Sequence, residues 1–581
     1  MIERSQALAA LSRSEFDVVV VGGGITGAGV ALDAASRGYS VALLERADFA
    51  SGTSSRSSKL VHGGLRYLQN FDLGLVREAL LERQLMVALA PHLVRPLPLV
   101  VPAFEGARPD RLLGVGLNLY DVMSVDRDRL RSGRSAIGRG RRARGERGAP
   151  VEEEPVRPEV STLTGTGESW SPERHRTISG EEVLELLPAL GAREPTSGYL
   201  FYDCQTDDVR LVLTVLGEAE RFGAVCANRM DVTGLLERDG LAFGVQATDS
   251  ETGETFAVRA ANVVNATGVW ADRLRPQELH DEAELPRIRP SRGTHITLHH
   301  DDLPLVGGAI VPAGEGRTIF ALPWLGRTLI GTTDNDYEGS LDHVAPAAED
   351  VDYLLAAVNE FFASTFTPAD LTGAYAGVRP LISTGDPKKS VDISRKAELY
   401  ETSSGMITIT GGKLTTWRRM AKMTVDRLVL RDARDAPCRT HEIPLGQAIS
   451  VEELPRVEGV PEQPYAPLAA RYGHAAEKVL QTASERGELA QPMIAGLPDL
   501  LAEAPFAARH EQARSVADVV LRRTRLGLLA GREVCAPDSE LPGRVARALA
   551  PELGWDAVRI EHEVERFREA AAAEGIAVDV G

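Results

Sequence analysis

The amino-acid sequence predicts a fold that is part α/β and part α+β. Residues 18–44 have the strand, helix, strand pattern of a parallel sheet, and residues 224–329 alternate short strands with turns, as a mixed sheet would. The chain after about residue 440 is rich in Ala, Glu, Leu and Arg at helical spacing. Because 581 residues exceed what one hydrophobic core can serve, we expect two interleaved domains over 1–440 and a helical C-terminal domain over 441–581.

The first strand and helix carry a phosphate-binding pattern. Residues 18–21 are four valines, and Gly22, Gly24 and Gly27 follow at once as G-x-G-x-x-G at the start of a helix. The next strand ends in Glu45. Glycines permit a tight turn and let a pyrophosphate approach the helix N-terminus, while the acid can accept hydrogen bonds from ribose hydroxyls. The pattern predicts a Rossmann-type dinucleotide-binding domain.

Composition and charge argue against several classes of protein. The apolar share of 43% and charged share of 25% are typical of globular chains, and the net charge of −18 disfavours a nucleic-acid binder. The four cysteines form no metal-ligand pattern, so we expect no metal and a reducing, cytoplasmic location. The sequence has neither a signal peptide pattern nor an apolar run long enough to span a bilayer, which leaves peripheral membrane attachment open.

An arginine-rich insertion follows the N-terminal part. Residues 127–147 contain nine arginines among Gly, Ser and Ala, and an acidic run follows. Since such a segment has too few large apolar residues to order itself, we expect a mobile loop over about 130–178. The alternative hypothesis is contact with an anionic membrane surface, which clustered arginine favours.

Further segments favour FAD over NAD as the dinucleotide. The hydroxyl-rich run 51–59 and the turn 62–64 could follow the pyrophosphate and ribityl chain of an extended flavin, although a flexible polar linker is the alternative. Residues 263–268 and 407–413 are each a predicted strand that ends in small residues, and a helix is expected from Leu414. The N-terminus of that helix, placed at the flavin pyrimidine, would stabilise the negative charge of the reduced flavin.

Most of the chain carries motifs in a fixed order: VVVVGGGITGAG, SSRSSKLVHGGLRYL, YDCQTDDVRLVL, NATGVWAD, SRGTHI, LPWLGRTLIGTTD, YAGVRPL and TGGKLTTWR, with RRTRLGL near the C-terminus. In this order they resemble the FAD-dependent glycerol-3-phosphate dehydrogenase family, within the D-amino-acid-oxidase-like flavoproteins. The resemblance spans roughly residues 15–430. HGGLRY, GVRPL and GGKLT are its more specific parts, and the arginine-rich insertion departs from the shorter family pattern.

The resemblance implies a quinone-linked enzyme that oxidises sn-glycerol 3-phosphate at C2 to dihydroxyacetone phosphate, with noncovalent FAD as the first electron acceptor. It also implies a place in the cytoplasm or on the inner face of the cell membrane, and it allows a homodimer. Together with the motifs it implies these cofactor-binding residues: Gly22, Gly24, Ile25, Thr26, Gly27, Glu45, Arg46, Thr53, Ser54, Ser58, Lys59, His62, Gly63, Gly64, Leu65, Ala266, Thr267, Gly268, Trp270, Gly377, Gly412, Lys413, Leu414 and Thr415.

The expected catalytic residues follow from the chemistry of a phosphorylated secondary alcohol. A phosphate ester requires fixed cations, and Arg66, Arg379 and Lys413 each lie in a motif expected beside the flavin. Removal of the hydroxyl proton requires a base, for which His295 is the first candidate, although a structural histidine is the alternative. Tyr67, which follows Arg66, completes the expected set.

Three other functions stay open at this point. An oxidase would pass electrons to O₂ and release hydrogen peroxide, and a flavin amine oxidase of similar fold would act on small amino acids. Three cations fit a dianionic ester better than they fit a carboxylate. A dinucleotide-sensing protein without turnover would show no bleaching of its flavin when substrate is added without oxygen.

Overall fold

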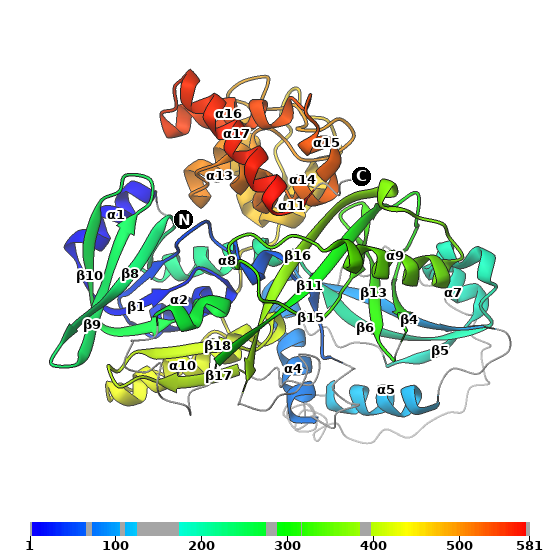
Figure 1. Ribbon diagram of the computed structural model, residues 1–581, viewed down its shortest axis with the longest axis horizontal. Helices are drawn as coiled ribbons and strands as arrows, with labels where there is room; N and C mark the ends of the chain where they lie inside the picture. Colours follow the sequence, from blue (N-terminus) through cyan, green and yellow to red (C-terminus); the bar gives the residue numbers. More distant parts are fainter. Residues whose placement is uncertain are drawn as a thin grey trace, which may run out of the picture.

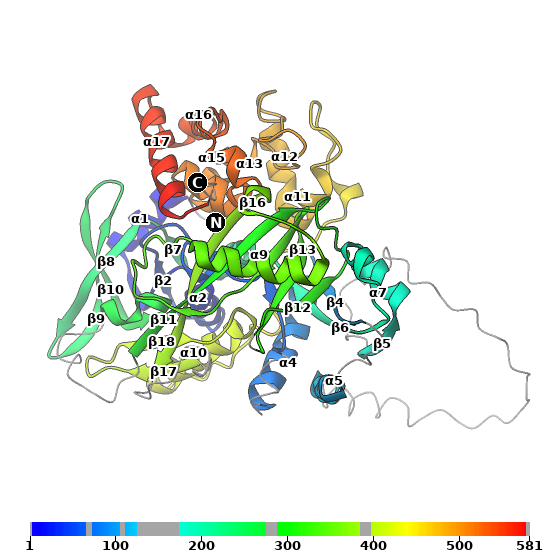
Figure 2. The same ribbon diagram turned by 45° about the vertical axis from the view of Figure 1, so that its right-hand side comes forward.

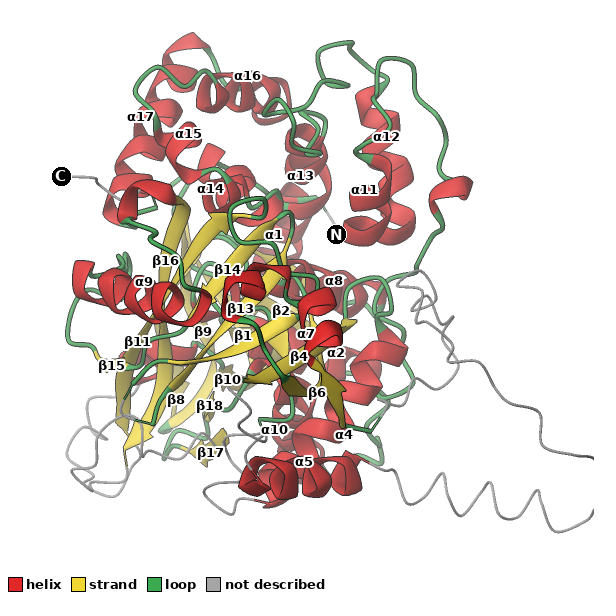
Figure 3. Cartoon of the chain, turned by 90° about the vertical axis from the view of Figure 1, so that its right-hand side faces the viewer, coloured by secondary structure: helices red, strands yellow, loops and turns green. Residues whose placement is uncertain are grey.

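The computed structural model has the expected mixed class, with two β-sheets and a helical C-terminal part (Figure 1). It describes residues 3–64, 73–104, 111–124, 174–274, 287–314, 316–383 and 397–576. The C-terminal helices lie above both sheets in Figures 1 and 3. The predicted fold class is therefore confirmed.

The first sheet is the Rossmann-type sheet that the glycine motif predicts. Its strands lie in the order β17-β18-β10-β1-β2-β7 and are parallel from β18 to β7, while the hairpin β8–β9 pairs with the first half of β10. The bounds are β1 Glu15–Val21, β2 Val41–Leu44, β7 Val225–Ala227, β8 Met230–Arg238, β9 Leu241–Asp249, β10 Thr255–Asn265, β17 Ala397–Glu401 and β18 Ile407–Gly411.

The valines of β1 explain why this strand is buried on both faces. Val18 and Val20 pack in one core with helices α2 (Ile25–Ser36), α8 (Asp208–Arg221) and α10 (Trp417–Arg431). Val19 and Val21 pack on the opposite face with α1 (Arg4–Arg13) and the β8–β9 hairpin. Successive side chains of a strand alternate between faces, so a run of four valines supplies apolar side chains to both layers. The strand ends at Val21, and the glycine motif begins at Gly22.

The second sheet is antiparallel except where β4 pairs with β12. Its order is β15-β11-β14-β13-β12-β4-β6-β3, with β16 beside β11 and β5 beside β6. Helices α9 (Ala348–Phe362) and α7 (Gly180–Leu186) pack on one face, and α4 (Leu73–Leu89) and α5 (Arg111–Ser124) on the other (Figure 2). The strand bounds are β3 Leu60–Val61, β4 Arg95–Ala103, β5 Arg176–Ser179, β6 Ser197–Gln205, β11 Arg287–His299, β12 Gly308–Pro312, β13 Thr318–Trp324, β14 Arg327–Gly331, β15 Asn335–Asp336 and β16 Leu371–Ser383.

Two expectations about segments need correction. The strands of 224–329 divide between the two sheets, because strand periodicity predicts a strand but does not identify its partner. The expected mobile loop is wrong at its end, since Arg176–Ser179 forms β5 and pairs with β6. The side chain of Ile178, within this strand, is buried in the core. Composition alone does not reveal this packing. Residues 125–173, where the rest of that loop falls, lie outside the described residues.

The C-terminal helices surround a core of their own, which includes Leu480, Phe506 and Leu549. We propose that this region is the separate C-terminal domain, with its boundary near residue 440. The main helices are α11 Tyr465–Tyr472, α12 Ala476–Ala483, α13 Glu503–Glu511, α14 Leu526–Leu529, α15 Gly531–Cys535, α16 Leu541–Leu553 and α17 Ala557–Ala573. Within the described ranges, no helix combines the length and the apolar character that crossing a bilayer requires.

Candidate active site

A cavity of about 760 Å³ lies at the carboxyl ends of the parallel strands β1, β2, β10 and β18. Ligands bind at this edge of open parallel sheets, and the volume lies within the usual range for ligand pockets. The expected cofactor residues that line it are Gly22, Gly24, Ile25, Thr26, Glu45, Arg46, Thr53, Ser54, Ala266, Thr267, Gly268, Trp270, Gly412, Lys413 and Leu414. The structure thus brings together three parts of the chain that lie far apart in the sequence, at 22–54, 266–270 and 412–414.

The glycine motif serves both the packing of the turn and the openness of the cavity. A Cβ atom on Gly22, whose φ is +110°, would lie 2.7 Å from the carbonyl oxygen of Ala266, and one on Gly27 would lie 1.9 Å from that of Gly22. These two glycines are required by the protein itself. A Cβ on Gly24 would meet Ser54 alone, 3.1 Å from its Oγ, so Gly24 mainly keeps the cavity wall free of side chain.

Glu45 fixes the glycine turn from the end of β2. Its carboxylate accepts hydrogen bonds from the backbone N–H of Gly23, at 2.7 Å, and of Ala47, at 2.8 Å. Burial raises the pKa of Glu45, and these two N–H donors oppose that rise. Because each carboxylate oxygen can accept a further bond, the arrangement is compatible with the ribose contact predicted for this residue.

The other side of the cavity offers an indole donor and the start of a helix. Trp270 Nε1 is buried and has no hydrogen-bond partner among the described residues, and Arg46 lies 5.4 Å from the centre of its ring. Lys413 and Leu414 line the cavity where a 3₁₀ turn, Leu414–Thr416, leads into α10. The glycine cradle and the helix start both fit a bound dinucleotide.

Several expected cofactor residues do not line this cavity: Gly27, Ser58, Lys59, His62, Gly63, Gly64, Gly377 and Thr415. Thr415 Oγ1 instead bonds with the backbone of His62, and a Cβ on Gly377 would lie 2.6 Å from that of Arg56. Lys59 is wholly buried. A cofactor contact for these residues stays a prediction, and Leu65, Arg66 and Tyr67 lie outside the described residues.

His295 lies on β11, between β14 and β16 in the second sheet, and it is buried. Its Nε2 lies 2.8 Å from Ser58 Oγ, and its Nδ1 has no hydrogen-bond partner among the described residues. Burial, together with the nearby cations Lys59 and Arg379, holds the pKa of His295 well below its usual range. The imidazole is therefore neutral at physiological pH, the state in which a histidine can accept a proton.

Neighbouring strands hold the His295 ring from two sides. In the sheet register, His295 pairs with Gly331 of β14 and with Tyr375 of β16. A Cβ on Gly331 would lie 2.3 Å from the imidazole, so only glycine leaves room for the ring there. The Tyr375 ring stacks on the other side. The ring orientation is thus fixed by packing before any substrate binds.

Arg379 lies on the same face of the sheet as His295. It pairs with Ser291, and the glycines Gly293 and Gly377 oppose each other between the two positions. A Cβ on Gly293 would lie 2.6 Å from Arg379 Nη2, which places the guanidinium over Gly293 and on the His295 side of its own Cα. The glycine pair therefore lets the Arg379 guanidinium and the backbone of Arg56 lie close against the sheet on this face.

The guanidinium of Arg379 is held by β14 and the loop that follows it. It donates to Thr332 Oγ1 at 3.0 Å, to the carbonyl oxygen of Thr333 at 3.2 Å and to Asp334 Oδ1 at 3.2 Å. The next residue, Pro380, lines the cofactor cavity. Thr53 Oγ1, from the cavity wall, donates to the carbonyl of Val378 at 2.6 Å. Strand β16 thus links the cavity to the region of His295.

Three contributors to this site were not predicted from the sequence. Tyr375, Asp208 and Asp203 all lie inside motifs, but no residue pattern reveals their partners. Asp203 accepts hydrogen bonds from Tyr120, Arg83 and the backbone N–H of Gly63, and so fixes the turn that precedes Arg66. The one available signal was the acidic YDCQTDD motif itself, whose carboxylates are unusual in an otherwise apolar strand and helix.

Comparisons with known proteins give the class first. The chain matches the family described as FAD dependent oxidoreductase over residues 17–427 and the family described as the C-terminal domain of alpha-glycerophosphate oxidase over residues 438–560. The fold and the dinucleotide cavity agree with that class. The protein is an FAD-dependent oxidoreductase, with FAD as its cofactor.

Its relatives then narrow the family. Glycerol-3-phosphate dehydrogenase 2 of Mycobacterium tuberculosis is 35% identical and covers 98% of this chain and 91% of its own length. The aerobic glycerol-3-phosphate dehydrogenase of Bacillus subtilis is 34% identical over 90% of this chain and 89% of its own. The FAD complex of the glycerol-3-phosphate dehydrogenase from Bacillus halodurans covers 100% of this chain and 99% of its own, with a TM-score of 0.75 and 28% identity. The chain belongs to the glycerol-3-phosphate dehydrogenase family.

Proposed function

We propose that this protein oxidises sn-glycerol 3-phosphate at C2 to dihydroxyacetone phosphate, with FAD as the first electron acceptor and a quinone as the next. The observation that carries the proposal is the placement of a neutral His295 and the cation Arg379 on one sheet face, in paired strands of which β16 also lines the FAD cavity through Pro380. The 35% identity to glycerol-3-phosphate dehydrogenases over nearly the whole chain supports the choice of substrate.

The residues of the chain divide the work of the reaction. FAD bound in the cavity would supply the acceptor for the hydride from C2. His295 takes the proton of the C2 hydroxyl, since its imidazole is neutral and its ring is held in place by Tyr375. Arg379 binds the phosphate, and Arg66 and Lys413 are the further cations proposed for it. The substrate loses one hydride and one proton, which leaves the ketone.

Asp334 forms an ion pair with Arg379, the residue proposed to bind the phosphate. Its carboxylate lies 3.2 Å from Arg379 Nη1 and also accepts a hydrogen bond from Ser291 Oγ. A carboxylate beside the guanidinium compensates its charge when the site is empty and fixes its direction. We propose that the phosphate binds to the guanidinium edge that faces away from Asp334, so that the anchor keeps both partners.

The test of this function is a comparison of substrates. The purified flavoprotein is assayed with an artificial electron acceptor and with glycerol 3-phosphate, glycerol or glycine. Turnover that requires the phosphate supports the proposal, because three cations serve no purpose for uncharged glycerol. Turnover of glycine without glycerol 3-phosphate would instead establish the amine oxidase alternative.

The electron acceptor separates the dehydrogenase from an oxidase. The match of residues 438–560 to a region named for alpha-glycerophosphate oxidase supports O₂ as the second candidate. Stoichiometric hydrogen peroxide in air would identify the oxidase. Slow peroxide release together with fast reduction of a soluble quinone analogue supports the dehydrogenase.

We further propose a cytoplasmic protein that associates peripherally with the inner face of the membrane, where a quinone is available, and that forms a homodimer. The arginine-rich insertion is the proposed contact with anionic lipid, worth on the order of 1 kcal/mol per arginine near the surface. Co-sedimentation with anionic liposomes should weaken when residues 131–147 are deleted. Unchanged co-sedimentation would leave the insertion without that role.

A further inference from the structure

Arg525 of the C-terminal part reaches into the oxidoreductase part and ends against a buried carboxylate. Its Nη2 donates to Asp208 Oδ1 at 3.0 Å and to the carbonyl oxygen of Ser55 at 2.8 Å. Both side chains of this ion pair are at most 1% exposed. Arg525 precedes α14, and its backbone has a φ of +66°, which non-glycine residues seldom adopt and which the surrounding contacts must hold.

Asp208 passes this contact on to the segment 55–59. Its other oxygen, Oδ2, accepts hydrogen bonds from Lys59 Nζ at 2.7 Å, from Ser57 Oγ at 2.7 Å and from the backbone N–H of Ser57 at 3.1 Å. Lys59 also donates to the carbonyl of Ser55, the atom that Arg525 contacts. Asp208 therefore holds Ser57 and Lys59, while Arg525 and Lys59 hold the carbonyl of Ser55 at the start of the segment.

The same segment supports the His295 ring through two further contacts. Ser58 Oγ lies 2.8 Å from His295 Nε2, and Tyr375, which stacks on His295, donates its hydroxyl to the carbonyl oxygen of Ser57 at 2.8 Å. Both contacts depend on where residues 57 and 58 lie. An unbroken series of close contacts thus runs from the C-terminal part to the residue proposed as the base.

We propose that Arg525 is a positioning residue for the reaction: it fixes Asp208, which fixes the segment 55–59, which in turn sets the position of the His295 ring. The inference rests on the proposed function, because it takes His295 as the base. The C-terminal part would thus affect the rate of the reaction by positioning His295, without contacting the reacting atoms.

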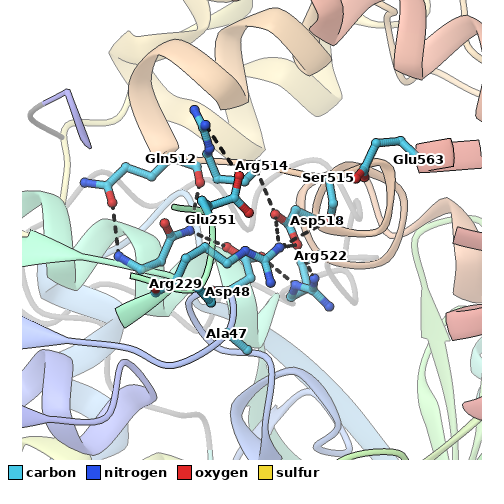
Figure 4. Close-up of polar contacts among 12 residues, drawn as sticks. Ala47, Asp48, Arg229, Glu251, Gln512, Arg514, Ser515, Asp518, Arg522 and Glu563 are labelled. Carbon is cyan, nitrogen blue, oxygen red and sulfur yellow. Dashed lines mark hydrogen bonds and ion pairs between the residues drawn. The ribbon is translucent and has the colours of Figure 1, made fainter. Parts of the chain in front are cut away.

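The other arginines of the RRTRLGL motif, Arg522 and Arg523, pair with a different carboxylate. Arg522 and Arg523 both donate to Asp48, on the loop after β2. Arg522 also pairs with Asp518 (Figure 4). In Figure 4, Arg229 donates a hydrogen bond to the same carboxylate of Asp518. These contacts dock the two parts of the chain beside the FAD cavity and do not reach Asp208. Arg523 is therefore a matched control for Arg525, equally buried in the same motif.

The charges around Lys59 supply a second readout. Lys59 faces Asp208 and Asp207 of the α8 N-terminus, Arg525, and the rings of Tyr375 and Trp324. Burial and the nearby Arg525 lower the pKa of Lys59 to about 7, against the opposing effect of Asp208. Removing the Arg525 charge should therefore raise the pKa of Lys59.

The experiment compares Arg525→Gln and Arg525→Lys with Arg523→Gln in the FAD-loaded protein. We expect Arg525→Gln to keep its flavin and its KM for glycerol 3-phosphate within about threefold while kcat falls at least about tenfold, with partial recovery in Arg525→Lys. Lysine NMR in selectively labelled protein reports the second readout, since the chain has seven lysines and Lys59→Met assigns the signal. The Lys59 pKa should rise in Arg525→Gln and stay the same in Arg523→Gln.

Each result decides between the roles. Unchanged kcat and unchanged Lys59 titration in Arg525→Gln would overturn the proposal, and so would an equal loss of kcat in Arg523→Gln, which would show a docking role only. If Arg525→Gln does not fold, Ser58→Ala and Arg525→Lys are combined: additive effects on kcat contradict the proposal, and shared effects support it. An inactive wild-type flavoprotein would contradict the proposed function, while the NMR comparison would still test the Arg525 contact.

Discussion

The imidazole of His295 lies nearly parallel to the ring of Tyr375, with 4.7 Å between the ring centroids and 6° between the planes. The two residues pair across β11 and β16, so the stack is built into the sheet register. The hydroxyl of Tyr375 is anchored on the carbonyl of Ser57 at the far end. The imidazole proposed as the base therefore has a fixed ring plane.

Removing the Tyr375 hydroxyl should cost less than removing its ring. Tyr375→Phe keeps the stack and loses one hydrogen bond, whereas Tyr375→Leu loses a stack worth about 0.5–1.5 kcal/mol. We expect kcat to fall little in the Phe variant and by about tenfold in the Leu variant, with the flavin content unchanged. Equal kcat in the two variants would show that the stack does not orient the base.

Replacing His295 tests its role as the base. His295→Gln keeps a polar side chain but cannot accept the hydroxyl proton, so kcat should fall by about 10²- to 10⁴-fold while FAD stays bound. The matched control is His299→Gln, on the same strand but half exposed. The measurement is kcat with an artificial acceptor and the ratio of flavin to protein. A His295→Gln enzyme with near wild-type kcat would make His295 a structural residue.

Arg379 should anchor the phosphate. Arg379→Lys keeps the charge but loses the planar fork, so the variant should retain FAD and some activity and show a raised KM for glycerol 3-phosphate. Arg379→Ala should lose about 2–5 kcal/mol in kcat/KM, because the phosphate would lack a charge-assisted partner. Near wild-type kinetics in the Ala variant would indicate that Arg379 serves only to bind Asp334. Flavin loss in both variants would assign it to the cofactor.

Two of the motif glycines, Gly24 and Gly27, should respond differently to substitution. Gly24→Val should give a folded protein without FAD, because its side chain would meet Ser54 and fill the cavity wall. Gly27→Ala should instead lower the melting temperature, since the new Cβ would lie 1.9 Å from a carbonyl oxygen. Gly217→Ala is the control, since its Cβ would have nothing within 4 Å. Full flavin content in purified Gly24→Val would disprove the cradle.

An ion pair between Glu574 and Arg56, at 2.9 Å, joins the C-terminal part to the segment 51–59. This contact should be sensitive to acid. Burial alone would raise the pKa of Glu574, but Arg56 and His343 lower it to about 2. A depressed folded-state pKa stabilises the fold above the unfolded value of about 4.3, and this stability is lost as the pH falls toward 2. Near neutral pH, Glu574→Gln should therefore lower the free energy of unfolding by about 3 kcal/mol and so lower the melting temperature. The difference from wild type should shrink in acid. A difference in melting temperature that is independent of pH would contradict this assignment.

Local patterns were sufficient to predict the segments that line the cavity proposed for FAD. The strand, turn and helix around Gly22, the strand ends at Ala266 and Gly412, and the acid Glu45 each form a short motif whose backbone geometry depends on its own residues. The parallel sheet then brings the strand ends to one edge. That is why most of the predicted cofactor residues line the cavity.

The support of His295 could not be predicted in this way. Tyr375 and Ser57 are 318 positions apart, and Arg525 and Asp208 are 317 apart, so these contacts follow from the packing of whole domains. Lys59 illustrates the same limit. In the sequence it is a cation in a hydroxyl-rich run, which predicts a cofactor contact, but in the fold its amine is buried against Asp208. A residue pattern identifies a charge and leaves its partner undetermined.

The most direct test of the account is the visible spectrum of the purified flavoprotein, recorded without oxygen before and after addition of sn-glycerol 3-phosphate. The account predicts bleaching of the flavin band by glycerol 3-phosphate, much slower bleaching in His295→Gln, and none with glycerol. A flavin band that stays unchanged with glycerol 3-phosphate in the wild-type protein would contradict it.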